Sequence, residues 1–250
     1  MILVVSDLDE VLRADKGPVA RELAEAIARI GSRSDVTICI ITGAPHAHIP
    51  PIFYHTAFAE SGAVRLDQHG TLAIAHEGEE VIKDLRRALG ITKDDGIDEI
   101  KEGSVIIEEP RFCSLTLLFG APPHYPGLIT SASPAKVMER IKDFVGDRRA
   151  AGLHILPGAH KSYEWIDITT TTKEATVGRL LAAMPDVKKA YYLGDGRNDL
   201  AVMRNPHITP VGFANSIPEI QELVYICGIY IPHPGPQGGA LEFFRFLESQ

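Results

Sequence analysis

The chain has 250 residues, 45% of them hydrophobic and 23% charged, the composition of a globular protein with about one or two domains. The net charge is −8 and no block of Lys and Arg is present, so a nucleic-acid partner is not expected. The three cysteines are far apart, which predicts neither a zinc site nor a disulfide framework. No apolar run has the length of a signal peptide or a membrane span. We therefore expect a cytoplasmic protein without a membrane partner.

Residues 1–75 alternate between strand and helix patterns. The run at 2–6 is continuously apolar, as in a strand that is covered on both faces of a parallel sheet. Further strands are predicted at 36–41, 57–59, 64–67 and 71–75, and a helix is predicted at 19–30.

Residues 76–165 have a different pattern, with two helices among paired strands. The helices are predicted at 77–89 and 134–149. The strands are predicted at 105–108, 114–119, 153–156 and 162–168. This order is typical of an α+β domain.

Residues 166–250 return to alternating elements. Helices are predicted at 171–184, 198–203, 216–224 and 239–248, and strands at 190–193, 208–213 and 226–231. We therefore expect an α/β fold, with a Rossmann-like parallel core formed by residues 1–75 and 166–250. An α+β domain at residues 76–165 interrupts this core.

Two of the predicted strands end in paired carboxylates. Asp7 and Asp9 follow the first strand, and Asp195 and Asp199 follow the strand at 190–193. In a doubly wound fold, ligands bind at the carboxyl ends of the strands. Either pair alone is common in turns and helix caps. Four carboxylates at two strand ends need a cation, however, and oxygen ligands suit Mg²⁺.

A second group of residues can bind an anion. Thr42 and Gly43 follow the strand at 36–41, and Lys173 lies in the first turn of a predicted helix. A hydroxyl, backbone N–H groups and a lysine at a helix start suit a phosphate group, although each alone is more typical of a turn or a solvated surface. Together with the carboxylates, they predict a metal ion and a phosphate in one site, where a carboxylate can attack phosphorus.

The ordered motifs resemble those of the haloacid dehalogenase superfamily of phosphohydrolases. They are DLDEV at 7–11, ITG at 41–43, Lys173 and GDGRND at 194–199. The inserted domain, Ser61-Gly62 and residues 232–240 resemble the Cof-type branch, in which the insertion is a type 2 cap domain. Sugar-phosphate, phosphoglycolate and mannosyl-3-phosphoglycerate phosphatases, and phosphomannomutase, belong to this branch or lie near it. The resemblance covers the whole chain and implies a Mg²⁺-dependent phosphatase that acts on a small phosphorylated metabolite through a phospho-aspartate.

The resemblance also implies a role for each motif residue. Asp7 is the expected nucleophile and a metal ligand. Asp9 is the expected general acid and base, and its backbone carbonyl is expected to reach the metal. The other expected metal ligands are Asp195 and Asp199. The residues expected to bind the phosphate group are Thr42, Gly43, Lys173 and Asn198.

Three positions depart from the family pattern. Glu10 stands where the family usually has Gly, Val11 where it often has Thr, and Ala44 where many members have Arg. The side chain of Glu10 is expected to alter the turn next to the site, and Ala44 removes one anion contact.

In the inserted domain, Arg111, His160 and Lys161 are the candidate residues for contacting the leaving group. Cap domains of this kind close over the core and exclude water during the reaction. The plainer interpretation of His160 and Lys161 is a solvated turn between two strands.

Two other functions are compatible with the same aspartates. A phosphomutase of the phosphomannomutase type returns the phosphate to its substrate. An aspartate-phosphorylated signalling or binding protein retains it, but signalling receivers are shorter and lack an inserted domain. The sequence indicates neither the physiological substrate nor the oligomeric state.

Overall fold

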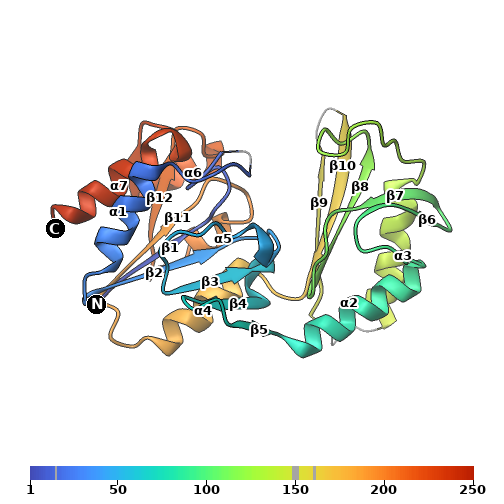
Figure 1. The fold of residues 1–250 in the computed structure, drawn as a ribbon, viewed down its shortest axis with the longest axis horizontal. Helices are drawn as coiled ribbons and strands as arrows, with labels where there is room; N and C mark the ends of the chain where they lie inside the picture. Colours follow the sequence, from blue (N-terminus) through green and yellow to red (C-terminus); the bar gives the residue numbers. More distant parts are fainter. Residues whose placement is uncertain (15, 148–151, 160–161) are drawn as a thin grey trace. The chain divides into compact units, whose positions relative to one another are not determined.

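The structure is a computed structural model that describes residues 1–14, 16–147, 152–159 and 162–250. The chain divides into two compact units. The first unit is formed by Met1–Ala73 and Lys173–Gln250, and the second by Ile74–Thr172. Each unit is built on a sheet of its own (Figure 1).

The sheet of the first unit has eight strands in the order β13-β12-β11-β1-β2-β3-β4-β5. The strands from β13 to β3 are parallel, and β4 pairs with β3 antiparallel. The bounds are β1 (Ile2–Ser6), β2 (Val36–Ile41), β3 (Thr56–Ala59), β4 (Val64–Asp67), β5 (Leu72–Ile74), β11 (Lys189–Leu193), β12 (Thr209–Phe213) and β13 (Ile229–Ile231). The predicted Rossmann-like parallel core is confirmed.

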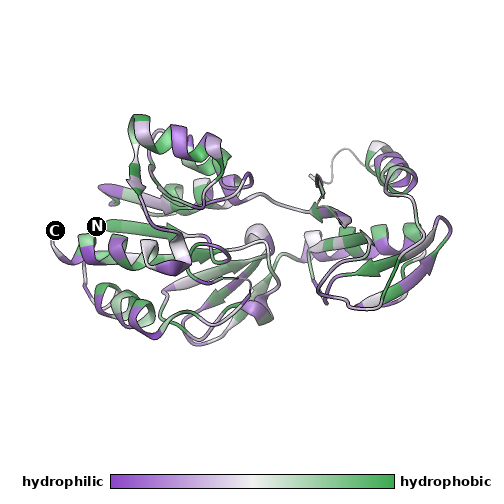
Figure 2. Ribbon diagram, turned by 90° about the horizontal axis from the view of Figure 1, so that it is seen from above, coloured by the Kyte–Doolittle hydropathy of each residue, from purple (hydrophilic) through white to green (hydrophobic). Residues whose placement is uncertain are grey.

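Helices cover both faces of this sheet. Alternate residues of β1 contact different layers, with Val4 in one hydrophobic core and Leu3 and Val5 in the other. The first core includes residues of α1 (Arg21–Gly31) and α7 (Gly239–Glu248). The second includes residues of α4 (Lys173–Ala183), α5 (Leu200–Met203) and α6 (Pro218–Cys227). Polar and apolar residues alternate along these helices, as expected for helices with one buried side (Figure 2).

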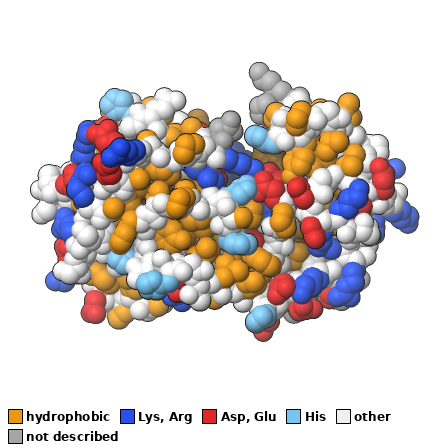
Figure 3. Space-filling model, viewed as in Figure 1, with side chains coloured by type: hydrophobic (Ala, Val, Ile, Leu, Met, Phe, Trp, Pro, Cys, Tyr) orange, Lys and Arg blue, Asp and Glu red, His pale blue; other side chains and the backbone are white. Residues whose placement is uncertain are grey.

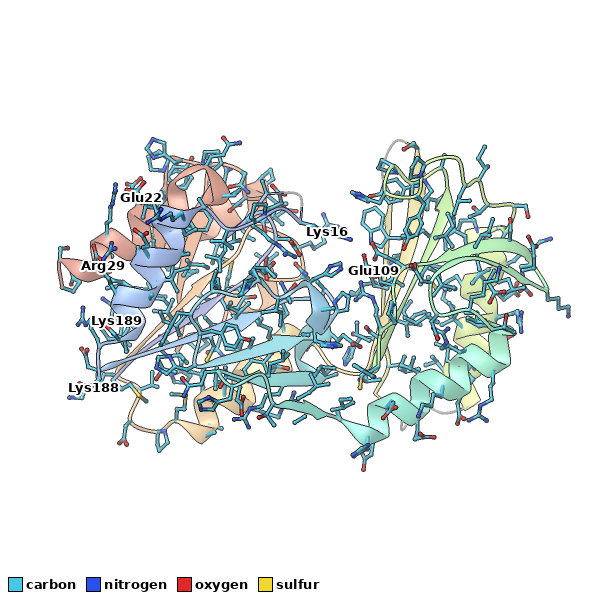
Figure 4. All side chains as sticks on the ribbon, in the orientation of Figure 1. Lys16, Glu22, Arg29, Glu109, Lys188 and Lys189 are labelled. Atoms are coloured by element: carbon cyan, nitrogen blue, oxygen red, sulfur yellow. The ribbon has the colours of Figure 1, made fainter. Side chains whose placement is uncertain are left out.

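Helices α1 and α7 are also joined by ion pairs on their outer side. Arg29 Nε lies 2.8 Å from Glu248 Oε1, and Glu22 pairs with Arg245. Figure 4 labels Arg29 and Glu22 on α1. All four side chains are well exposed, and exposed pairs contribute only about 0–1 kcal/mol. The apolar contact between the helices therefore holds them together.

The second unit has a five-stranded antiparallel sheet in the order β6-β7-β8-β10-β9. Its strands are β6 (Gly96–Ile100), β7 (Gly103–Ile107), β8 (Ser114–Gly120), β9 (His154–Ala159) and β10 (Tyr163–Thr169). Helices α2 (His76–Leu89) and α3 (Pro134–Asp147) share a core with alternate residues of β8 and β10. This is the predicted inserted α+β domain.

The boundaries of this domain differ from the expected ones at its second end. The expected boundary between residues 165 and 166 falls inside β10, which pairs along its whole length with β8. The chain cannot leave the sheet there without breaking this ladder. The unit therefore ends at Thr172, and at its first end it begins at Ile74.

Acidic and basic side chains alternate with apolar ones over the face in Figure 3. Among the described residues, no helix combines the length and the apolar composition that crossing a membrane requires.

Candidate active site

The parallel pairing of β1 and β11 brings the two carboxylate motifs together. Ser6, the last residue of β1, lies opposite Leu193, the last residue of β11. The backbone N–H of Asp7 continues this ladder and donates to the Leu193 carbonyl at 2.9 Å. Asp7 is buried, and its Oδ1 accepts the Leu8 N–H at 2.7 Å. The Asp7 carboxylate is therefore fixed at the carboxyl edge of the sheet, next to the loop that follows β11.

Asp199 is held inside that loop. Its side chain is completely buried and accepts a hydrogen bond of 2.6 Å from the Tyr192 hydroxyl. Its Oδ2 accepts the backbone N–H groups of Asp195 and Gly196 at 3.2 and 3.1 Å. A Cβ atom on Gly194 would lie 2.7 Å from the Asp199 Cβ, so the loop requires glycine there. The loop with the sequence GDGRND is thus folded around the side chain of its last residue, Asp199.

Lys173, from the first turn of α4, connects the two motifs. Its Nζ lies 2.7 Å from Asp7 Oδ2 and 2.8 Å from Asp199 Oδ1. The side chain is 1% exposed, so the ammonium group is removed from solvent together with both carboxylates. The attraction between this buried cation and the two buried anions offsets part of the cost of their desolvation.

The net negative charge of this cluster perturbs its titration. Burial, and then the Asp199 carboxylate, raise the pKa of Asp7 well above its usual range, although Lys173 opposes this. Burial and Asp199 also raise the pKa of Asp195 to about 7. Burial lowers the pKa of Lys173, but Asp199 and Asp7 outweigh it, so the pKa rises and the ammonium stays charged. One buried lysine does not neutralise the carboxylates.

The donor set fits a divalent cation. Carboxylate oxygens of Asp7, Asp195 and Asp199 lie within 4.8 Å of one another. These are hard oxygen ligands, which Mg²⁺ prefers. Burial, and then the neighbouring Asp199 carboxylate, raise the pKa values of Asp7 and Asp195, and a bound cation would offset the repulsion among these carboxylates. Asp7, Asp195 and Asp199 are therefore the residues that could hold a metal ion.

Of the residues predicted to bind phosphate, Lys173 lies in this cluster, and the others lie on nearby loops. Ile40 of β2 is opposite Ser6, so Thr42 and Gly43 follow β2 at the same edge of the sheet. Thr42 is buried, and its hydroxyl accepts the Ala44 N–H at 3.1 Å. Asn198 is exposed in the loop between Asp195 and Asp199.

Asp9 lies outside the metal cluster and has a partner that the sequence analysis missed. Arg13 Nε lies 2.7 Å from Asp9 Oδ1. Arg13 Nη1 donates to the carbonyl of His48, in the short η1 helix (His46–His48) after β2, at 2.7 Å. Residues 9–13 form a turn and not a helix, so the spacing of four residues between the opposite charges did not indicate this pair.

The backbone at position 10 has a conformation that favours glycine, although the residue is Glu10. Glu10 has φ +58°, in the left-handed region that glycine adopts at no steric cost. Its carbonyl accepts a hydrogen bond of 2.8 Å from Asn215 Nδ2, and Asn215 Oδ1 accepts the Gly235 N–H at 2.8 Å. These contacts hold the turn in a conformation that costs a non-glycine residue about 1–3 kcal/mol. The Glu10 carboxylate also contributes to raising the pKa of Asp195.

Of the three candidate residues of the inserted domain, the structure describes Arg111. Arg111 Nη2 lies 3.2 Å from Glu108 Oε2, and the arginine side chain is 10% exposed. His160 and Lys161 lie outside the described residues. Their role in contacting a leaving group remains a prediction.

Comparison with known proteins gives a likeness in structure but none in sequence. No family model and no curated protein matches the sequence. A phosphatase of the haloalkanoate (HAD) enzyme superfamily from Bacteroides thetaiotaomicron has a TM-score of 0.61 at 15% identity, over 99% of this chain and 94% of that chain. The sucrose-phosphatase from Synechocystis sp. PCC6803, solved with sucrose and phosphate, has a TM-score of 0.58 at 12% identity, over 99% and 98%.

A trehalose-6-phosphate phosphatase from Aspergillus fumigatus is similar over 98% of this chain and 93% of that chain, with a TM-score of 0.59 and 15% identity. Each likeness spans both units and includes the inserted domain. The chain therefore has the fold of the haloacid dehalogenase superfamily, as its motifs predicted.

Proposed function

We propose that this protein is a Mg²⁺-dependent phosphatase that hydrolyses a small phosphorylated metabolite through a phospho-aspartate on Asp7. The cluster of Asp7, Asp195, Asp199 and Lys173 carries this proposal. It combines a buried nucleophile, an oxygen-lined position for a cation, and a lysine that contacts the nucleophile directly. Phosphoryl transfer needs mainly this kind of positioning and charge stabilisation.

In the first half of the reaction, an Asp7 oxygen attacks phosphorus and the bond to the leaving oxygen breaks. Asp9 donates a proton to that oxygen, so an alcohol leaves. Lys173, the Thr42 hydroxyl, the Gly43 N–H and Asn198 bind the phosphoryl oxygens. A bound Mg²⁺, held by Asp7, Asp195, Asp199 and the carbonyl of Asp9, would offset the charge of the phosphoryl group.

In the second half, Asp9 takes a proton from a water molecule, which attacks phosphorus. The bond between phosphorus and Asp7 then breaks, releasing inorganic phosphate and regenerating the carboxylate. The pairing of Lys173 with Asp7 supports this step, because the ammonium group favours the negative charge that develops on the leaving carboxylate.

The similar structures also favour a substrate class. Two of the similar structures are phosphatases named for trehalose-6-phosphate and for sucrose phosphate chemistry, which favours a sugar phosphate or a related metabolite for this protein as well. The three free cysteines favour the cytoplasm as its compartment.

The test is a hydrolysis assay with 4-nitrophenyl phosphate and a panel of phosphorylated metabolites. We expect turnover in Mg²⁺, loss of turnover in EDTA, and recovery when Mg²⁺ is added back. Asp7→Asn should lose at least about 10³-fold in kcat while remaining folded. The control is Asp143→Asn, at an exposed position of α3, which should keep normal activity. Full activity in EDTA or in Asp7→Asn would refute the proposal.

A further inference from the structure

One oxygen of the Asp9 carboxylate contacts Arg13, and the other is available to water or a ligand. Its Oδ1 lies 2.7 Å from Arg13 Nε. No hydrogen bond joins its Oδ2 to any residue that the structure describes. The side chain is 34% exposed, so water or a ligand can reach it. A general acid and base needs one fixed oxygen to set its orientation and one available oxygen to exchange the proton.

Arg13 is itself fixed by the fold. It is 5% exposed, and its Nη1 donates to the His48 carbonyl at 2.7 Å. Its backbone closes a tight turn, in which the Arg13 N–H donates to the Leu8 carbonyl at 3.2 Å and the Arg13 carbonyl accepts the Glu10 N–H at 2.7 Å. The position of the guanidinium group is therefore set by the turn after β1 and by the His48 carbonyl of η1, independently of Asp9.

The third nitrogen of this guanidinium distinguishes the pair from an ordinary surface ion pair. Nη2 is buried and makes no hydrogen bond with a described residue. An arginine usually grips a carboxylate with two parallel N–H groups, which occupies both carboxylate oxygens. Here the Nε contact alone is made, and the second oxygen of Asp9 is left out of the pair. Stability alone would favour the bidentate form, because a buried donor without an acceptor is costly.

We propose that Arg13 is a positioning residue that clamps Oδ1 of Asp9 and so presents Oδ2 for proton exchange with the leaving-group oxygen and then with water. This inference rests on the proposed function, because it assigns Arg13 a role in that reaction. Without the contact to Arg13, the Asp9 side chain can occupy all three staggered χ1 rotamers. The fraction of molecules with the productive rotamer then falls about threefold. A displaced carboxylate can cost as much as about 100-fold.

A purely structural Arg13 makes a different prediction from a positioning Arg13. If it only ties the loop after β1 to η1, its loss should lower activity toward all phosphate esters equally. If it positions the general acid, the loss depends on the leaving group. An alkyl phosphate releases an alkoxide that must be protonated, whereas 4-nitrophenyl phosphate releases an anion that needs no proton.

The experiment measures kcat/KM of the full-length protein in Mg²⁺ for an alkyl phosphate and for 4-nitrophenyl phosphate. The value of kcat/KM reports the steps up to transfer of the phosphoryl group, where Asp9 acts as the acid. The variants are Arg13→Met, which removes the guanidinium at similar length, and Arg13→Lys, which retains the charge. Asp9→Asn gives the reference pattern for a missing acid.

Arg33→Met is the matched control. Arg33 also pairs with a carboxylate, that of Asp35, and donates to a backbone carbonyl, that of Leu247. It lies between α1 and β2, at the opposite end of β2 from Thr42. Its substitution should leave both kcat/KM values unchanged.

We expect Arg13→Met to lose between about threefold and 100-fold more activity on the alkyl phosphate than on 4-nitrophenyl phosphate, as Asp9→Asn does. Arg13→Lys should also lose more activity on the alkyl phosphate than on 4-nitrophenyl phosphate, but by a smaller factor than Arg13→Met. Equal losses on the two substrates would overturn the inference. If Arg13→Met does not fold, Arg13→Lys decides by the same comparison. A wild-type protein that hydrolyses neither ester would instead refute the proposed function.

Discussion

Replacing Asp195 by Asn should stabilise the metal-free protein at alkaline pH, although it removes a residue of the active site. Burial and the Asp199 carboxylate raise the pKa of Asp195 from 3.8 to about 7. The folded state therefore binds more protons than the unfolded state between about pH 4 and pH 7. Over this window the free energy of unfolding falls as the pH rises, and above pH 7 the full penalty is present. Asparagine carries no charge, so the variant is not destabilised in this way as the pH rises.

The magnitude follows from the size of the shift. One pKa unit corresponds to about 1.4 kcal/mol, so a shift of about three units sets an upper value of about 4 kcal/mol. Asp195 is half-buried, and water screens part of this repulsion, so we expect about 2–4 kcal/mol at pH 8. At pH 4 the carboxyl group is protonated in the folded state and about half ionised in the unfolded state, so little of the penalty has developed and the difference between variant and wild type should be small.

Urea unfolding in EDTA at several pH values measures this difference. Asp143→Asn, at an exposed position, controls for the general effect of losing one negative charge and should show no such trend. Adding Mg²⁺ should reverse the order at pH 8, because a bound ion stabilises the folded state more when it binds more tightly, and the variant has lost one of the carboxylates that hold the ion. A stability difference between Asp195→Asn and wild type that does not change with pH would refute this electrostatic reasoning.

Three further substitutions test the charged cluster and the packing around two glycines. Lys173→Met leaves two buried carboxylates unpaired, so it should lower the free energy of unfolding by about 3–5 kcal/mol at pH 8 and abolish hydrolysis, as urea unfolding and the phosphatase assay can show. Gly62→Ala should be destabilising in a thermal melt, since φ is +111° and the new Cβ would lie 1.9 Å from Thr176 Oγ1. Gly146→Ala, in α3 with open space around it, should instead be stabilising by about 0.5–1 kcal/mol. Equal effects of the two glycine substitutions would contradict the packing argument.

The convergence of Asp7, Asp195 and Asp199 was predictable from sequence, because these residues follow strands with a clear apolar pattern. The continuous apolar runs before Asp7 and Asp195 required strands buried on both faces, and parallel strands end at one edge. Arg13 was not predictable in the same way. Its pairing with Asp9 depends on a tight turn whose third residue, Glu10, adopts a left-handed conformation that glutamate seldom takes.

Two elements were missed or misplaced for identifiable reasons. Strand β6 was not predicted because its middle residue, Asp98, is a buried carboxylate that accepts the N–H groups of Thr92 and Lys93 at 2.6 and 2.9 Å. A buried acidic residue interrupts the run of apolar residues from which a buried strand is predicted. The predicted strand at 226–231 began too early, because the apolar residues Tyr225 and Ile226 belong to the exposed end of α6. Apolar composition alone does not separate a helix end from a strand.

The most direct measurement of the central claim is chemical trapping of the phospho-enzyme. The protein is mixed with 4-nitrophenyl phosphate and Mg²⁺, quenched in acid within the first turnovers, and digested for mass spectrometry. The account predicts a phosphoryl group on the peptide that contains Asp7, absent from Asp7→Asn and absent when EDTA replaces Mg²⁺. Steady turnover in which no phosphorylated Asp7 can be trapped, together with an active Asp7→Asn variant, would contradict it.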